Sequence, residues 1–327
     1  MNELIDQFPE QLRVALQIGQ HAKLTLKGKK FDQVYVSGLG GSGIGASLVQ
    51  DYVVDKLTIP FIVNKNYHIA RCVNKNTLFI ACSYSGNTEE TLEAVSMARA
   101  AKATIVCITS GGALEFFARK HGIDLILIPS GMPPRACLGY SVTQLLYTLQ
   151  RAGLLTKQFE AEYESAIADI EKLGKTIRKK ASGIAAKLAG RELHLYSTAG
   201  HEGLTVRFRQ QLNENAKVVA SHNIVPEMTH NEIVGWRKEQ KQRTVIFISS
   251  PQDYALNLKR LAFLRKVVKS FRAEVIDLAL SGKSYWYDAF LFIHLSDWIS
   301  VELAGLNGQD AVEVKVIDKL KAEMAKK

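Results

Sequence analysis

The 327-residue sequence lacks the features that would place it outside the cell or in a membrane. No apolar run reaches the length of a membrane span, and the N-terminal stretch MNELIDQFPE is too polar for a signal peptide. The four cysteines all lie in the first half without a CxxC pair, and three of them sit in or beside apolar runs. These absences predict a cytoplasmic protein with buried free thiols and no membrane partner.

Acidic residues are in the minority, with 32 Asp and Glu against 42 Lys and Arg, which gives a net charge of +10. The basic excess lies in ordinary helical stretches such as KLGKTIRKK and the C-terminal KAEMAKK. A solvated basic helix face accounts for this pattern, so we expect no nucleic-acid partner. The hydrophobic fraction of 47% and the charged fraction of 23% are those of a globular protein with room for two domains.

Short apolar, β-branched runs alternate with helical patterns along the chain, which is typical of buried parallel strands. A polar, helix-prone stretch at about 156–190 divides the series in two. The predicted strands are 31–38, 59–64, 76–83, 102–110 and 124–130 before it, and 192–200, 216–221, 244–250 and 274–280 after it. The sequence therefore predicts an α/β fold with two doubly wound parallel sheets joined by a helical linker, in domains 1–153 and 154–327.

The glycine-rich turn SGLGGSGIG (37–45) contains Gly38-x-Gly40-x-x-Gly43, which matches the dinucleotide-binding fingerprint. That fingerprint also requires an acid at the end of the second strand, and here the strand ends at Asn64. The nucleotide interpretation is therefore not favoured. A strand, a glycine turn and a helix N-terminus remain, with Ser42 placed so that its hydroxyl can face an anion.

The third strand also ends in a polar turn, SYSGNTEET (83–91), with hydroxyls at Ser83, Ser85 and Thr88. Asn87 and Glu90 have the spacing of a capping box, which predicts that a helix begins there. Capping alone would explain one or two hydroxyls. Two neighbouring strands that both end in this way instead indicate a phosphate site at the carboxyl edge of the sheet, bound by free amides and helix dipoles.

The segment HNIVPEMTHNEIVGW (222–236) has the pattern of neither a core strand nor a surface helix. A zinc site formed by His222, His230 and Glu232 is one interpretation, but the spacing matches no standard zinc motif. Pro226 also argues against one helix that carries all three ligands. A catalytic loop and an irregular connection remain as interpretations of this segment.

Five motifs in order resemble one known family: GLGGSGIG and SYSGNTEET, then PPRACLGYS (133–141), NENAK (213–217) and VPEMTHNEIVGW (225–236). The first two resemble the phosphate-binding signature of the sugar isomerase (SIS) domain. All five resemble the bifunctional phosphoglucose/phosphomannose isomerases, which have two SIS domains. The resemblance covers nearly the whole chain and implies a phosphate site at Gly41, Ser42, Ser83, Ser85 and Thr88.

The activity implied by this resemblance interconverts an aldose 6-phosphate and a ketose 6-phosphate through a cis-enediol, without a metal or redox cofactor. The chemistry needs a carboxylate base, a cation for the enediolate and an acid/base that opens the sugar ring. The family's base falls on Glu214, and its enediolate-stabilising arginine falls on Arg135. Its C-terminal lysine near the sugar oxygens falls on Lys321. Its ring-opening histidine falls on His230, which implies a homodimer because that residue acts across the subunit interface.

One departure from the family concerns the residues before the last helix, where relatives often carry Asp-Pro-Thr-Pro-Val. This chain has Asp-Ala-Val-Glu-Val at 310–314, so the expectation of mannose activity is weaker than that of glucose activity. Two alternatives remain open on the sequence. One is a non-catalytic regulator that binds sugar phosphates, although no helix-turn-helix segment precedes the first strand. The other is another SIS enzyme that isomerises aminosugar phosphates.

Overall fold

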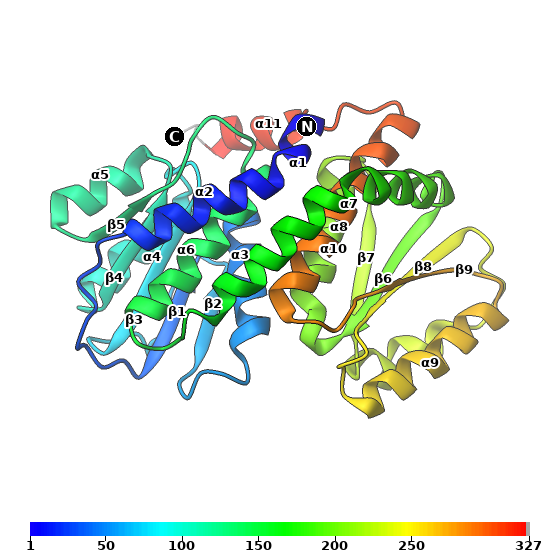
Figure 1. Cartoon of the computed structure of the whole chain (residues 1–327), viewed down its shortest axis with the longest axis horizontal. Helices are drawn as coiled ribbons and strands as arrows, with labels where there is room; N and C mark the ends of the chain where they lie inside the picture. Colours follow the sequence, from blue (N-terminus) through cyan, green and yellow to red (C-terminus); the bar gives the residue numbers. More distant parts are fainter. Residues whose placement is uncertain (325–327) are drawn as a thin grey trace.

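The computed structural model describes residues 1–324 and contains two parallel sheets (Figure 1). The N-terminal sheet has five strands in the order β2-β1-β3-β4-β5, and the C-terminal sheet has four in the order β7-β6-β8-β9. The strands are β1 (Gln33–Ser37), β2 (Phe61–Asn64), β3 (Thr77–Ser83), β4 (Thr104–Thr109), β5 (Asp124–Leu127), β6 (Glu192–Thr198), β7 (Ala220–Val225), β8 (Arg243–Ser249) and β9 (Glu274–Ala279). The predicted doubly wound α/β class is confirmed.

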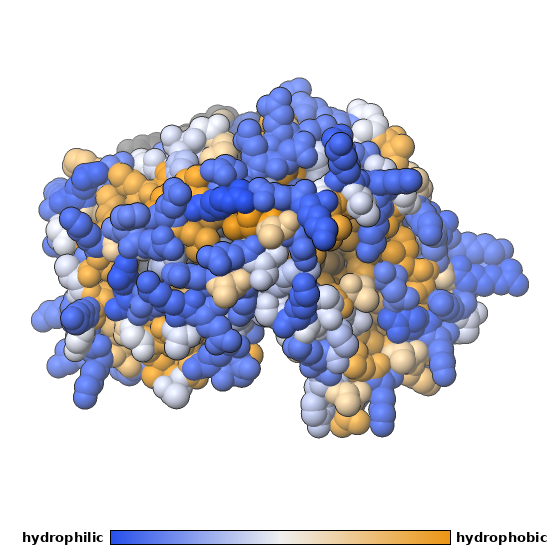
Figure 2. Space-filling model, in the orientation of Figure 1, coloured by the Kyte–Doolittle hydropathy of each residue, from blue (hydrophilic) through white to orange (hydrophobic). Residues whose placement is uncertain are grey.

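Helices cover both sheets and join them. The N-terminal half contains α1 (Asn2–Asp6), α2 (Phe8–His21), α3 (Gly40–Val53), α4 (Glu89–Ala100), α5 (Gly112–His121) and α6 (Leu138–Arg151). The predicted linker is the long helix α7 (Gln158–Leu188), followed by α8 (Glu202–Glu214), α9 (Ala255–Ser270), α10 (Tyr285–Leu306) and α11 (Lys315–Met324). In the orientation of Figure 1, the space-filling view shows a mostly hydrophilic face with a notch between the two halves (Figure 2).

The strand order places the predicted phosphate site at a switch point of the N-terminal sheet. β1 pairs with β2 on one side and with β3 on the other, in parallel register. The chain therefore leaves the carboxyl ends of β1 and β3 next to each other, and the helices that follow them diverge from that point. Such a switch point is where open α/β sheets bind ligands.

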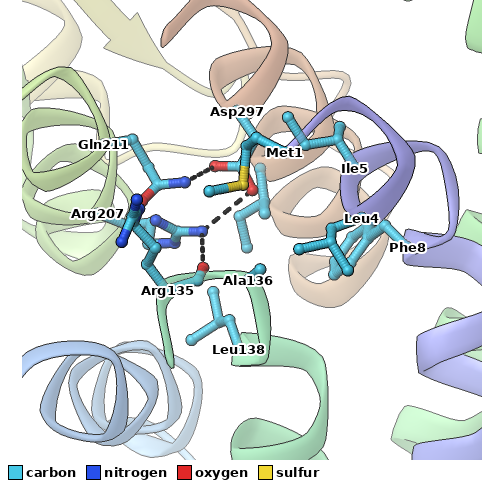
Figure 3. A pocket seen from close by; sticks show the side chains of 11 residues that line it. Met1, Leu4, Ile5, Phe8, Arg135, Ala136, Leu138, Arg207, Gln211 and Asp297 are labelled. Atoms are coloured by element: carbon cyan, nitrogen blue, oxygen red, sulfur yellow. Dashed lines mark hydrogen bonds and ion pairs between the residues drawn. The ribbon is translucent and has the colours of Figure 1, made fainter. Parts of the chain in front are cut away.

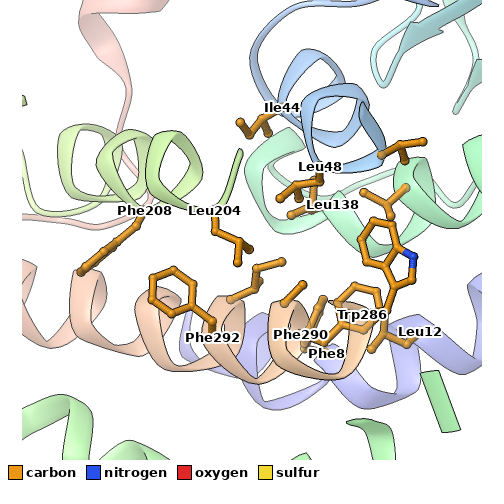
Figure 4. Packing of buried hydrophobic residues seen from close by; sticks show 14 of the residues in the cluster. Phe8, Leu12, Ile44, Leu48, Leu138, Leu204, Phe208, Trp286, Phe290 and Phe292 are labelled. Carbon is orange, nitrogen blue, oxygen red and sulfur yellow. The ribbon is translucent and has the colours of Figure 1, made fainter. Parts of the chain in front are cut away.

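One hydrophobic core extends through both halves, and the apolar helix α10 forms much of it. Figure 4 shows Phe8 of α2, Leu48 of α3 and Leu204 of α8 turned toward Trp286 and other side chains of α10. Burying an aromatic side chain such as Trp286, which is 0% exposed, stabilises the fold by about 1.5–3 kcal/mol. The boundary at residues 153/154 stays a prediction, and the last three residues of the predicted second domain lie outside the described range.

By length and composition α10 could cross a membrane, which corrects the expectation that no apolar run in the sequence is long enough. Within residues 1–324 it is the helix that passes this test, and 67% of its most apolar window is buried inside the protein. Helices α7 and α8 pack against it. A helix that is apolar all round is buried in this way when it forms the core of a large domain.

The segment 222–236 corrects one sequence prediction. Its first four residues belong to strand β7, which begins at Ala220 and pairs with β6, whereas the strand was predicted at 216–221. β7 lies at the edge of its sheet, where polar residues such as His222 remain half exposed. The remainder of the segment forms two 3-10 turns, η3 (Glu227–His230) and η4 (Glu232–Gly235).

Candidate active site

A cleft of about 700 Å³ lies at the carboxyl ends of β1 and β3. It is bounded by the starts of α3 and α4 and by the C-terminal helix α11. Its lining residues are Leu39, Gly40, Gly41, Ser42, Tyr67, Tyr84, Ser85, Asn87, Thr88, Glu89, Glu90, Pro134, Ile317, Leu320, Lys321 and Met324. Four of the five predicted phosphate-binding residues and the predicted Lys321 therefore share one cleft.

Two helix N-termini supply the polar groups of this cleft. α3 begins at Gly40 and α4 begins at Glu89, so both present free backbone amides and the positive end of a helix dipole. Ser42 is buried, and its hydroxyl accepts a hydrogen bond from the backbone amide of Tyr84 (3.3 Å), which ties the two turns together. Hydroxyls and amides arranged in this way can bind a phosphate.

The turn after β3 is held by its own side chains. Ser83 is buried, and its hydroxyl accepts a hydrogen bond from the amide of Gly86 (3.1 Å) and shares another with the hydroxyl of Thr88 (2.9 Å). Ser83 is not in the cleft lining given above, and its contacts instead position Thr88. The predicted capping box is wrong, because the side chain of Asn87 accepts a hydrogen bond from the amide of Ala113 and α4 has no side-chain cap.

Glycines permit the close approaches that bring these turns together. A Cβ added to Gly41 would lie 2.9 Å from the carbonyl oxygen of Pro134, so a side chain there would push α3 away from the loop before Arg135. Gly86 has a φ of +70°, and a Cβ on it would lie 1.8 Å from the carbonyl oxygen of Gly111. The glycine-rich pattern therefore serves backbone packing around the phosphate cleft.

Arg135 follows Pro134, a residue of the cleft wall, and its side chain faces Glu214. Arg135 Nη1 lies 3.5 Å from Glu214 Oε2, with exposed side-chain fractions of 5% and 32%, respectively. Arg135 Nε also donates to the side chain of Asn215 (2.7 Å). Burial lowers the pKa of Arg135, and the nearby Glu214 carboxylate counteracts this shift. The site thus holds a buried cation next to a partly exposed carboxylate, as the acid/base chemistry requires.

A buried polar network supports the backbone of Arg135, as Figure 3 shows. Arg207 of α8 donates to the carbonyl oxygen of Arg135 (2.9 Å) and pairs with Asp297 of α10 (3.0 Å). Gln211 donates to the second oxygen of Asp297 (2.8 Å). Burial raises the pKa of Asp297, whereas the charge of Arg207 opposes that rise. The loop that carries Arg135 is therefore fixed by both halves of the chain.

His230 lies elsewhere in this chain. It ends the turn η3, its side chain is exposed, and the cleft lining, within the described part of the chain, does not include it. Asn231 next to it accepts from the amide of Glu232 and donates to the side chain of Glu227 (2.8 Å), so Asn231 shapes the loop. Arg135 and Glu214 are not in the cleft lining either, but they pair with each other next to Pro134 of the cleft wall, whereas no described contact brings His230 to that pair.

The alternative metal ligands have other contacts. Both carboxylate oxygens of Glu232 are engaged, one by the hydroxyl of Tyr196 and the other by the amide of Asn223 (2.6 Å). His222 Nδ1 lies 3.2 Å from the guanidinium of Arg209, and burial and that cation lower the pKa of His222. Across residues 1–324, no group of three or more His, Cys, Asp or Glu side chains is placed to hold a metal ion.

Three residues that support the site were not predicted from the sequence. Gln11 donates to the carbonyl oxygen of Ala136 (2.6 Å), and Arg207 holds the carbonyl of Arg135 from α8. Both residues lie in amphipathic helices and carry no motif of their own. Lys217, in contrast, belongs to the NENAK motif, so the motif contained a signal for it. These residues bind backbone carbonyls, a role that residue type alone does not reveal.

Comparison with known proteins defines the class first and then the family. The SIS domain model matches residues 28–129, and the model of the bacterial phospho-glucose isomerase C-terminal SIS domain matches residues 177–324. The C-terminal domain of glucosamine-fructose-6-phosphate aminotransferase from Francisella tularensis has the same fold, with a TM-score of 0.75 and 15% identity. That match covers 96% of this chain and 98% of the other. The fold is therefore that of two SIS domains.

Two curated relatives carry the same name, bifunctional phosphoglucose/phosphomannose isomerase. The protein from Caldicellulosiruptor bescii is 36% identical, with 99% of each chain covered. The protein from Aquifex aeolicus is 32% identical, over 88% of this chain and 89% of the relative. The chain belongs to the bifunctional phosphoglucose/phosphomannose isomerase family, and it is an enzyme. This finding does not favour the alternative of a non-catalytic regulator.

Proposed function

We propose that this protein interconverts glucose 6-phosphate and mannose 6-phosphate with fructose 6-phosphate. The observation that carries the proposal is the cleft between the N-termini of α3 and α4, which adjoins the Arg135–Glu214 pair. A phosphate at Gly41, Ser42, Ser85 and Thr88 would anchor one end of the sugar. The other end would then extend toward Glu214.

In this proposal Glu214 moves one proton. Its carboxylate removes the C2 proton of the open-chain aldose, and the two C–H bonding electrons form the C1=C2 bond of the enediolate. The same proton returns to C1, which takes up the electrons of the C1=C2 bond, and the hydroxyl proton of O2 passes to O1 as O2 becomes the ketone oxygen, so no oxidant or reductant is consumed. The Arg135 guanidinium faces the negative oxygens that develop in this step. Glucose and mannose phosphates share the enediol, because C2 is planar in it.

The remaining roles fall to Lys321 and His230. Lys321, on α11 in the cleft lining, would bind the sugar oxygens. His230 would open the ring at O5 from a neighbouring subunit, because an imidazole can both donate and accept a proton and its side chain is exposed on this chain's surface. The proposal therefore includes a homodimer. It also includes a cytoplasmic location, where the buried free thiols of Cys82, Cys107 and Cys137 stay reduced.

A direct assay tests the proposal. Purified protein is mixed with fructose 6-phosphate in the presence of a chelator, and the products are followed by NMR. Glucose 6-phosphate and mannose 6-phosphate should both appear. Glucose 6-phosphate alone would remove the mannose branch, for which the segment 310–314 departs from the family pattern. Conversion of an aminosugar phosphate, with none of fructose 6-phosphate, would establish the other SIS activity instead.

A further inference from the structure

Four consecutive carbonyl oxygens, those of residues 310–313, are bound by two cationic side chains. Arg135 Nη2 donates to the two inner carbonyls, at 2.7 and 2.9 Å. Lys217 Nζ donates to the two outer carbonyls, at 2.8 and 2.7 Å. The side chains of this segment do not make these bonds. The departure from the family sequence at 310–314 therefore leaves this attachment intact, because residues of any type supply a carbonyl.

Lys217 has a third partner, the carbonyl oxygen of Glu214 (2.6 Å). An ammonium has three N–H donors, so all of them are used, and only the charged form supplies three. Lys217 follows the end of α8, has a φ of +56° and is half buried. Its side chain thus joins the residue predicted to be the catalytic base to the segment 310–313.

That segment leads directly into α11, which begins at Lys315. None of the described residues of α11 is buried, and its apolar side chains Ile317, Leu320 and Met324 line the cleft. A helix without buried side chains gains little from packing, so its position depends on the segment that attaches it. Lys321 faces the cleft from this helix.

We propose that Lys217 is a positioning residue for the isomerisation. Its ammonium fixes the backbone of Glu214 and, through residues 310–313, holds α11 so that Lys321 faces the substrate. The three donors of Lys217 are used by backbone carbonyls, so Lys217 acts through Glu214 and Lys321 and not on the sugar itself. The inference rests on the proposed function, in which Glu214 and Lys321 act on the sugar.

The first test compares Lys217→Met with Lys102→Met. Lys102 is an exposed lysine with a φ of +59°, so the control makes the same substitution in the same backbone conformation. Lys217→Met should lower kcat about 10- to 100-fold, as expected when catalytic groups shift by an ångström or less. Lys217→Arg should recover part of the loss, because a guanidinium also donates to carbonyls. Lys102→Met should stay within two-fold of the parent, roughly the range of a neutral surface change.

A double variant shows whether Lys217 acts through α11. If it does, kcat of the double variant Lys217→Met with Lys321→Met should be about as low as that of the more damaging single variant, since both substitutions disrupt the same function. If kcat of the double variant instead falls by the product of the two single-variant factors, this part of the inference is overturned, because the free-energy effects of independent sites add. A general structural role for Lys217 would also give multiplied losses.

Hydrogen exchange tests the attachment without any substrate. Backbone amides at 310–324 should exchange at least about ten-fold faster in Lys217→Met than in Lys102→Met, because the segment loses two of its four carbonyl contacts. Unchanged exchange in this region would refute the inference. This measurement separates two failures: a parent protein without isomerase activity refutes the proposed function, whereas unchanged exchange refutes the role of Lys217.

Discussion

At the scale of single residues, the contacts of Arg135 explain why an arginine suits this position. Its Nε and Nη2 atoms bind Asn215 and the segment 310–313, so the side chain is already fixed before substrate arrives. Nη1 is left facing Glu214. A guanidinium can meet all of these partners at once because its donors form a planar fork, which a lysine lacks. Fixed charges of this kind stabilise a developing anion without reorganisation.

The proposed role of Glu214 as the base leads to the first prediction. Glu214→Gln should keep the fold and the binding of sugar phosphate but lower kcat by about two orders of magnitude or more, because a positioned base is lost. The matched control is Glu164→Gln, the same substitution at an exposed residue of α7. Steady-state kinetics of both variants provide the measurement. Turnover within a few-fold of the parent in Glu214→Gln would mean that another group removes the proton.

The second prediction concerns metal removal. Activity should survive exhaustive treatment with a chelator, because the proposed mechanism assigns each step to a side chain or a backbone dipole. The candidate ligand Glu232 already binds Tyr196 and Asn223 through its two oxygens. The measurement is the rate of fructose 6-phosphate conversion before and after chelation. A rate that falls and then returns when zinc is added would revive the site at His222, His230 and Glu232.

At the scale of elements, the sequence predicted the strands well and the details of their ends poorly. Buried strands such as β3 are uninterrupted apolar runs, so residue type alone identifies them. The edge strand β7 includes polar residues, and the prediction placed it several residues too early in the chain. The capping box at Asn87 failed because a tertiary contact with Ala113 took its side chain. Local patterns cannot include such long-range partners.

The candidate site shows the same limit. Motifs predicted which residues would gather in the cleft, since strand ends in one parallel sheet lie at one edge. They did not predict that Ser83 would be buried outside the cleft lining, and only the family resemblance, through Lys321, implied that the last helix lies near the sugar. The position of α11 depends on backbone carbonyls bound by distant side chains. The motifs include Arg135 and Lys217, but a sequence pattern does not show which carbonyls these side chains bind.

A contact between α3 and α8 gives the third prediction. Asp51 of α3 accepts a hydrogen bond from the amide of Gly203 near the start of α8 (2.8 Å), close to Lys65, His201 and Glu202. Burial raises the pKa of Asp51 from 3.8 to about 7. The protonated carboxyl therefore contributes stability that is fully present below about pH 4 and is lost as the pH rises through about 7.

Asp51→Asn should remove this pH dependence, because an amide resembles the protonated acid and can still accept from Gly203. The variant should have a higher Tm than the parent at pH 8, and the difference should shrink toward pH 5. Thermal unfolding between pH 5 and pH 8 measures it. Asp55→Asn is the control, because its exposed carboxylate pairs with Lys56, which lowers the pKa of Asp55, and so predicts no gain at pH 8. Parallel curves for Asp51→Asn and the parent would contradict the prediction.

At the scale of the whole molecule, the two halves act as one unit within a chain. Aromatic side chains from both halves meet in the shared core, for example Tyr52 and Trp286 with ring centroids 5.2 Å apart. The candidate cleft likewise combines turns at the carboxyl edge of the N-terminal sheet with α11. Of the proposed catalytic groups, Lys321 lines the cleft and the Arg135–Glu214 pair adjoins it next to Pro134, whereas no described contact brings His230 to either. A second copy of the chain is the source that the proposed function requires.

The last prediction tests that source by mixing two inactive variants. His230→Ala keeps Glu214, and Glu214→Ala keeps His230. If His230 acts across an isologous interface, one site of each mixed dimer has both groups and the other site has neither. Random assembly of equal amounts makes about half of the dimers mixed, so co-expression should restore about a quarter of the parent activity. Size-exclusion chromatography of each variant checks that both still form dimers. Confirmed mixed dimers with no more activity than the single variants would show that His230 serves its own chain or takes no part in catalysis.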